Sequence, residues 1–125
     1  MLFEPSYHSP KGEIIKEPFA TLMGEPNTNG VSWFTSDDGL YGLVNVDTGE
    51  IVKEPFAYMI STFNSNGIAT MMLNEGDNYS IISEEGNIIE ETDYAYISSF
   101  TDDNLASYRE YSNRPLGVLK VDFEN

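Results

Sequence analysis

The feature that most constrains this chain is a repeat with a fixed spacing of 37 residues. The segment GEIIKEPFATLM, residues 12–23, returns almost unchanged as GEIVKEPFAYMI, residues 49–60. Two series of small residues keep the same spacing: Gly12, Gly49 and Gly86, and Gly30, Gly67 and Asn104. A period of this length is typical of repeat architectures, in which one unit cannot bury its apolar side without a neighbour. The sequence therefore predicts three copies of one supersecondary unit.

The third copy has diverged from the other two. Residues 53–56, Lys-Glu-Pro-Phe, correspond to Glu-Glu-Thr-Asp at residues 90–93. The turn that ends at Gly86 is also one residue shorter than the turn that ends at Gly49. These slips compensate one another, because both series of small residues stay in phase.

The local signals are those of strands and turns. Residues 41–46 read as a strand, residues 47–49 as a turn, and residues 50–53 as the returning strand. Residues 68–73 read as a further strand that follows a second turn. The predicted fold class is all-β, built from antiparallel hairpin repeats with about three strands per unit and about nine to ten short strands in total.

A chain of 125 residues is expected to form one domain, here residues 1–125. The repeat units run roughly over residues 3–39, 40–77 and 78–114, with a partial fourth unit at 115–125. Two sets of equivalent apolar residues are expected in the core: Ile14, Ile51 and Ile88, and Val31, Ile68 and Leu105.

The repeated motif resembles the WG, or KWG, β-repeat family. The resemblance rests on residues 40–45, LYGLVN, then 48–52, TGEIV, and 54–56, EPF. The signature Trp-Gly pair is replaced in the second, third and partial fourth units by Tyr41-Gly42, Tyr79-Ser80 and Leu116-Gly117. The resemblance implies an interaction scaffold, and the family supplies no catalytic residues to carry over.

The charge is strongly acidic. Six Lys and Arg residues oppose 21 Asp and Glu residues, for a net charge of −15. From Glu54 up to Arg109 there are ten acidic residues and no basic one before the arginine. Such a surface repels nucleic acid and anionic membranes, so neither is expected as a partner. The acidity favours either solubility or attraction of a basic protein partner.

Few residues suggest chemistry. His8 is the only histidine and cysteine is absent, which disfavours zinc and disulfides. Adjacent carboxylates occur at four places that fall in or beside predicted turns, where they are expected to point into water: Asp37-Asp38, Glu84-Glu85, Glu90-Glu91 and Asp102-Asp103. None has the spaced ligands of a calcium loop. The sequence predicts no enzyme, no catalytic or metal-binding residue, and no cofactor.

The resulting hypothesis is a non-catalytic protein-interaction module whose acidic, tyrosine-bearing surface meets a basic protein partner. The predicted partner-binding residues are Tyr79, Glu84, Glu85, Glu90, Glu91, Tyr96, Asp102 and Asp103. The alternatives that stay open are an immunity or antitoxin-type inhibitor, a nucleic-acid charge mimic, and a hydrolase with an acidic cleft. A cytoplasmic location is expected, since the first residues show no secretory signal. The sequence leaves the oligomeric state open.

Overall fold

The computed structural model of the chain describes residues 12–122, and within this range it contains eleven β-strands and no helix. This confirms the all-β prediction. The strands are β1 (Leu22–Met23), β2 (Val31–Thr35), β3 (Tyr41–Asn45), β4 (Glu50–Ala57), β5 (Met59–Ile60), β6 (Ile68–Met72), β7 (Ser80–Ser83), β8 (Ile88–Glu91), β9 (Tyr96–Ile97), β10 (Leu105–Arg109) and β11 (Gly117–Lys120). No helix in the described range is long and apolar enough to cross a lipid bilayer.

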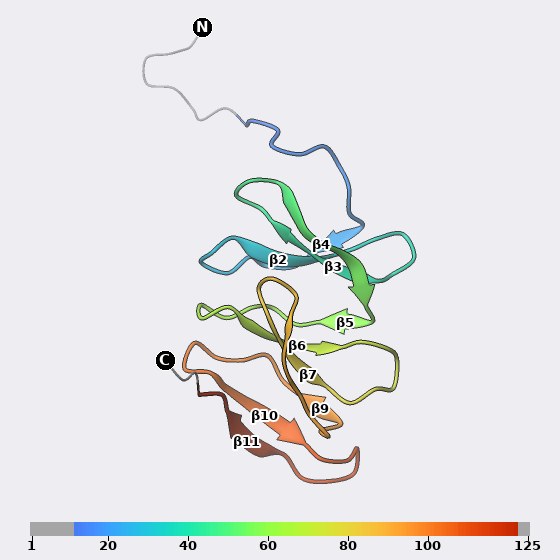
Figure 1. Ribbon diagram of the computed structural model, residues 1–125, viewed down its shortest axis with the longest axis vertical. Helices are drawn as coiled ribbons and strands as arrows, with labels where there is room; N and C mark the ends of the chain where they lie inside the picture. Colours follow the sequence, from blue (N-terminus) through green and yellow to red (C-terminus); the bar gives the residue numbers. More distant parts are fainter. Residues whose placement is uncertain (1–11, 123–125) are drawn as a thin grey trace, which may run out of the picture.

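The strands form three antiparallel sheets that lie one above another (Figure 1). The first sheet has the order β1-β2-β3-β4 and the second the order β5-β6-β7-β8, while the third contains β9, β10 and β11. Each sheet is a meander in which neighbours in sequence are neighbours in the sheet. Such local pairing follows from the short turns that the sequence encodes.

The 37-residue period is visible in the strands. β2, β6 and β10 begin 37 residues apart, and so do the two-residue strands β1, β5 and β9. The predicted strands at 41–46, 50–53 and 68–73 are found as β3, β4 and β6. The short strands β1, β5 and β9 were not predicted, so the first two sheets have four strands where the sequence suggested about three. Each sheet begins at its short strand. These strands lie in the second half of the units predicted from the sequence, so the sheets do not start at the predicted unit boundaries.

Two hydrophobic cores lie between the sheets. The first joins the upper two sheets and includes Val31 and Leu43 on one side and Ala69, Met71 and Ile82 on the other. The second joins the lower two sheets and contains Ile68, Tyr79, Ile81, Ile97, Phe100 and Ala106. The middle sheet is therefore covered on both faces, as expected for stacked units that cannot bury their apolar side alone.

The predicted core residues divide into a correct and an incorrect set. Val31 and Ile68 are buried as predicted, and Leu105 is half-buried because the last sheet is covered on only one face.

The prediction that Ile14, Ile51 and Ile88 are buried is wrong, because Ile14 is 72% exposed, Ile88 is 45% exposed and Ile51 is half-buried. Ile51 and Ile88 lie on β4 and β8, the outermost strands of their sheets, which meet solvent on one edge. No strand forms in residues 12–21, so Ile14 has no sheet of its own. Gly12 keeps the 37-residue spacing with Gly49 and Gly86, but no strand follows it in residues 12–21, and the residues before it fall outside the described range.

Candidate functional site

Three turns, one before each of β2, β6 and β10, share the same hydrogen bonds. In each turn the side-chain oxygen of the first residue accepts hydrogen bonds of 3.0–3.2 Å from the backbone N–H groups two and four positions later. These first residues are Asn27, Asn64 and Thr101. The residue three positions later has a positive φ, 82° at Gly30, 83° at Gly67 and 66° at Asn104. The predicted equivalence of these three positions is confirmed.

The three turns are linked to one another by asparagine side chains. The Asn27 Nδ2 donates to the backbone oxygen of Asn64 at 2.9 Å, and the Asn64 Nδ2 donates to the backbone oxygen of Thr101 at 2.7 Å. Thr101 has no amide, so it makes no link of this kind. We call this series of turns the asparagine ladder. Its direction is fixed, because each unit donates to the unit that follows it in sequence.

At the first junction, between the first and second turns, a carboxylate accepts the remaining amide protons. The Glu84 Oε2 accepts hydrogen bonds from the Nδ2 groups of Asn27 and Asn29, the latter at 2.9 Å. Glu84 reaches this point by lying over Gly67, where a Cβ would be 2.8 Å from the Glu84 Cδ. Gly67 is therefore required both for its positive φ and for the space that the carboxylate occupies.

At the second junction an amide oxygen replaces the carboxylate. The Asn104 Oδ1 accepts hydrogen bonds from the Nδ2 groups of Asn64 and Asn66 at 2.8 and 2.9 Å. The residue 37 positions after Glu84 is Val121, which cannot accept a hydrogen bond from an amide. Asparagine tolerates the left-handed conformation better than other residues with a side chain, so Asn104 can supply the acceptor from within the turn itself.

These junctions account for two of the predicted partner-binding residues. Glu84 is half-buried and bonded to the first turn, as described above. The Asp102 carboxylate accepts a hydrogen bond from the Ser65 N–H at 3.0 Å, and its backbone oxygen accepts one from the Asn66 side chain at 2.9 Å. Both residues thus hold neighbouring units together, whereas Asp103 is exposed beside them.

The two predicted tyrosines differ in exposure. Tyr79 is only 7% exposed and belongs to the lower core, so it is not an aromatic anchor on the surface. Burial, together with the neighbouring Tyr96, raises the pKa of the Tyr79 hydroxyl. The Tyr96 ring packs edge-on against Tyr79 at 5.7 Å between centroids and is 38% exposed. Only Tyr96 stays available as a surface contact.

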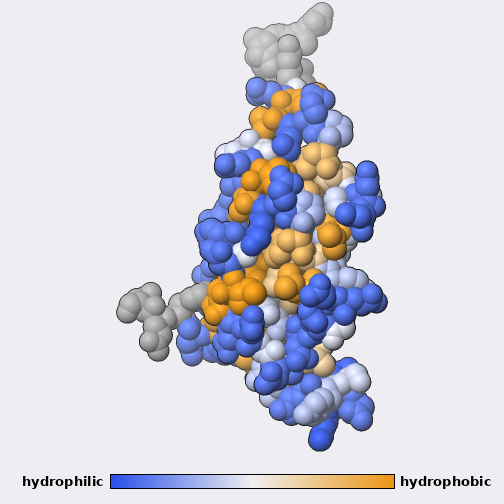
Figure 2. Space-filling model, turned by 45° about the vertical axis from the view of Figure 1, so that its right-hand side comes forward, coloured by the Kyte–Doolittle hydropathy of each residue, from blue (hydrophilic) through white to orange (hydrophobic). Residues whose placement is uncertain are grey.

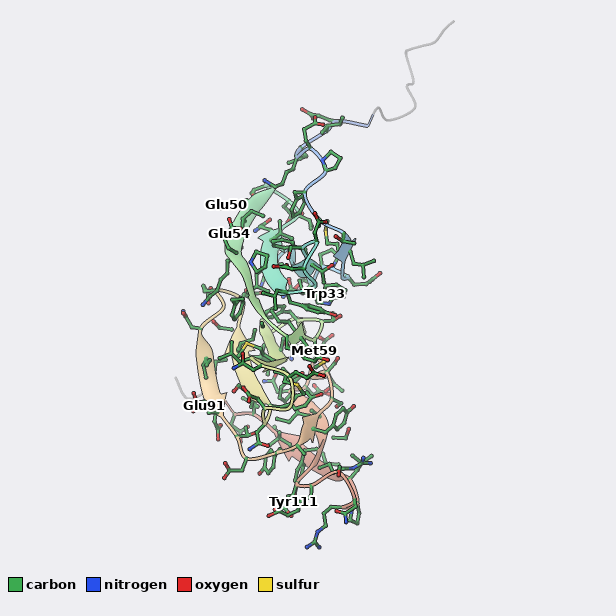
Figure 3. The ribbon with its side chains drawn as sticks, turned by 90° about the vertical axis from the view of Figure 1, so that its right-hand side faces the viewer. Trp33, Glu50, Glu54, Met59, Glu91 and Tyr111 are labelled. Atoms are coloured by element: carbon green, nitrogen blue, oxygen red, sulfur yellow. The ribbon has the colours of Figure 1, made fainter. Side chains whose placement is uncertain are left out.

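The remaining predicted glutamates lie at the outer side of the second sheet. Glu90 and Glu91 are exposed on β8, and Glu85 is exposed in the turn before it. Glu50 and Glu54 are exposed on β4, the corresponding outer strand of the first sheet. Figure 3 shows Glu50, Glu54 and Glu91 along the same side of the molecule. We call the surface formed by Glu50, Glu54, Glu90 and Glu91 the acidic edge.

The lysine on β4 forms no ion pair with the glutamates of this edge. The Lys53 Nζ donates to the backbone oxygen of Gly86 at 3.1 Å and lies 4.6 Å from the centroid of the Phe56 ring. The same pairing recurs one unit earlier, where the Lys16 Nζ lies 5.2 Å from the Phe19 ring centroid. The repeated KEPF motif thus places a lysine over an aromatic ring and, in the second copy, against the next sheet.

Ion pairs and metal ligands are sparse in the part of the chain that the structure describes. Within residues 12–122 the only ion pair is between Lys120 and Asp122, at 3.8 Å. The same residues contain no group of three or more His, Asp or Glu side chains that could hold a metal ion. His8 lies outside the described range.

The asparagine ladder was not predicted from the sequence. The signal was present, because Asn27, Asn64 and Thr101 keep the 37-residue spacing. In the sequence, Asn64 lies in a polar turn, and the glycine series is the more obvious repeat beside it. A polar residue that recurs in phase with a structural glycine would have identified the ladder.

Comparisons with known proteins found no counterpart. No family model, no curated protein and no solved structure matches this chain.

Proposed function

We propose that the protein is a non-catalytic interaction module that binds a basic protein segment along the acidic edge. The observation that carries this proposal is that the carboxylates of this edge have no cation of the described chain paired with them. Charged groups of one sign on a surface attract a partner of the opposite sign and raise its association rate. The resemblance to WG repeats implies the same interaction role.

The backbone of β8 supports a specific mode of binding. β8 pairs with β7 on one side and has no strand on its other side among the described residues. All four of its residues, Ile88–Glu91, are exposed. An exposed strand edge can accept an extended segment through main-chain hydrogen bonds. Glu90 and Glu91 repel a second β8, so the same charges that limit self-association favour a basic strand.

Exposed apolar groups lie beside these charges. Ile88 and Ile89 are 45% and 42% exposed, and Figure 2 shows that hydrophobic residues reach the surface between hydrophilic ones on the face in view. An edge of this composition suits a segment with both lysine and apolar side chains. Tyr96 is the aromatic residue that we propose as an additional contact, and Tyr96→Ala is expected to speed dissociation.

The experiment measures association and dissociation rates with a short peptide of alternating lysine and valine, at low and high salt. The variant carries Glu50→Gln, Glu54→Gln, Glu90→Gln and Glu91→Gln. We expect it to associate more slowly and with a weaker salt dependence, with a smaller change in dissociation.

The matched control makes the same change in charge away from the acidic edge. It carries Gln at three exposed glutamates, Glu25, Glu75 and Glu110, and Asn at the exposed Asp37. If the two variants slow association equally, net charge alone explains the attraction and the proposed site is wrong. An association rate that changes neither with the two variants nor with salt would contradict the role of charge.

A further inference from the structure

At the first turn of the asparagine ladder, one backbone oxygen accepts one hydrogen bond fewer than the equivalent oxygens of the other two turns. The backbone oxygens of Asn64 and Thr101 each accept two hydrogen bonds, one from within the turn and one from the asparagine of the preceding unit. The backbone oxygen of Asn27 accepts the bond from Gly30 within its turn, and no residue in 12–122 supplies the second. This end of the ladder faces away from the second sheet.

A carboxylate accompanies this open acceptor. Asp47 lies 37 residues before Glu84, and its carboxylate lies over Gly30 as that of Glu84 lies over Gly67. Glu84 accepts hydrogen bonds from the two asparagine amides of the preceding turn. Asp47 is exposed, and the hydrogen bonds between described residues include none to its carboxylate.

The junction between the first and second turns therefore serves as a template. There, a turn of sequence Asn-x-Asn-Gly docks onto a backbone oxygen and a carboxylate held above a glycine. The first turn presents the same two acceptors in the same arrangement. We propose that the end of the ladder formed by Asn27, Gly30 and Asp47 is a docking site for an Asn-x-Asn-Gly turn carried by a separate repeat polypeptide.

A second copy of this chain does not suit the site. The turns with the required sequence, at Asn27 and Asn64, already donate their amides within the molecule. The turn at the other end reads Thr101-Asp102-Asp103-Asn104, so it has no amide at its first and third positions. Its carboxylates would also face Asp47 and repel it.

The experiment uses the whole chain, labelled with ¹⁵N, and a backbone-cyclised hairpin peptide that copies residues 22–35. We expect this peptide to shift the amide resonances of Asn27, Gly30 and Val46. The matched peptide with aspartate at both asparagine positions should bind about tenfold more weakly, since it loses charge-assisted hydrogen bonds. Asp47→Ala should weaken binding of the first peptide by a similar factor, and Glu75→Ala, a change at a distant exposed glutamate, should not.

Each contrary result overturns the proposal. These results are no shift of the amide resonances with the asparagine peptide, equal affinity for the two peptides, or an affinity that Asp47→Ala leaves unchanged. Sedimentation of the chain alone tests the other occupant, because self-association that requires Asp47 would assign the site to a second copy. The acidic edge plays no part in this site, so failure here leaves the proposed function standing, and the reverse also holds.

Discussion

The two junctions of the asparagine ladder supply an acceptor oxygen to equivalent pairs of asparagine side chains, but the oxygen comes from a different residue at each junction. At the first junction the oxygen belongs to Glu84, which reaches across from the β7–β8 turn and lies over Gly67. At the second it belongs to Asn104, the residue that occupies the glycine position itself. All three positions have a positive φ, which asparagine tolerates, but a position whose space is filled by a neighbouring side chain requires glycine. The glycine and the distant carboxylate thus depend on each other, and both are replaced in the third copy.

The largest effect is expected from Asn64, the residue that belongs to both junctions. It is buried, its Oδ1 holds its own turn, and its Nδ2 donates to the third turn. Asn64→Ala should lower the free energy of unfolding by about 3 kcal/mol, because buried backbone groups lose their partners. Asn64→Asp keeps the acceptor and loses the donor, so its cost should be intermediate.

Urea unfolding followed by circular dichroism measures both losses. The exposed Asn74 supplies the control, and Asn74→Ala should change the free energy by less than about 0.5 kcal/mol. A cost at Asn64 as small as that of the control would mean that the ladder contributes nothing.

The second prediction replaces the acceptor of the first junction with the kind of acceptor that the second junction has. Gly67→Asn should cost about 2 kcal/mol alone, because its side chain meets Glu84, and Glu84→Val should cost about 1 kcal/mol. In the double variant the new asparagine has room and supplies the missing acceptor. Its cost should be smaller than the sum of the two by about 1 kcal/mol. Strict additivity in this double-mutant cycle would refute the equivalence of the two junctions.

The third prediction concerns a contact that the second junction lacks. Lys53→Met keeps the aliphatic stem and removes both the hydrogen bond to Gly86 and the cation above Phe56. We expect a loss of about 1 kcal/mol in the free energy of unfolding, measured by thermal and urea unfolding. Lys16→Met is the matched control and should cost less, since Lys16 is exposed. Equal costs would show that the bond to Gly86 has no net effect.

The smallest effect lies outside both junctions, at the turn that contains Ser36 and Asp38. The Ser36 hydroxyl, which donates to the Asp38 carboxylate, lowers the pKa of that carboxyl below its ordinary value. A carboxyl with a lowered pKa stabilises the fold above its unfolded pKa, and this contribution is lost as the pH falls through the folded pKa. Ser36→Ala should raise the pKa of Asp38, measured by a ¹³C titration of the carboxyl resonance. An unchanged titration would contradict the assignment of the cause.

Much of the fold could be predicted from the sequence, and the site less so. Local strand and turn signals predicted β3, β4 and β6, and the period identified Gly30, Gly67 and Asn104 as equivalent. The partner-binding residues were chosen by charge and residue type alone, which says nothing of hydrogen bonds to distant turns. For that reason Glu84 and Asp102 are among the predicted partner-binding residues, although both join neighbouring units.

The sequence by itself determined the repeat, the all-β class and the positions of the turns, because spacing, turn residues and strand propensity are local properties that a linear chain records. Only the tertiary structure decided which face of each unit is covered. Ile51 and Ile88 fit the apolar pattern as well as Ile68 does, yet only Ile68 is fully buried, since it lies between two stacked sheets. The stacking of the sheets also decided that Asn104 is the acceptor at the second junction, as Glu84 is at the first. Burial and hydrogen-bond partners depend on residues far away in the chain, and these meet only when the sheets pack.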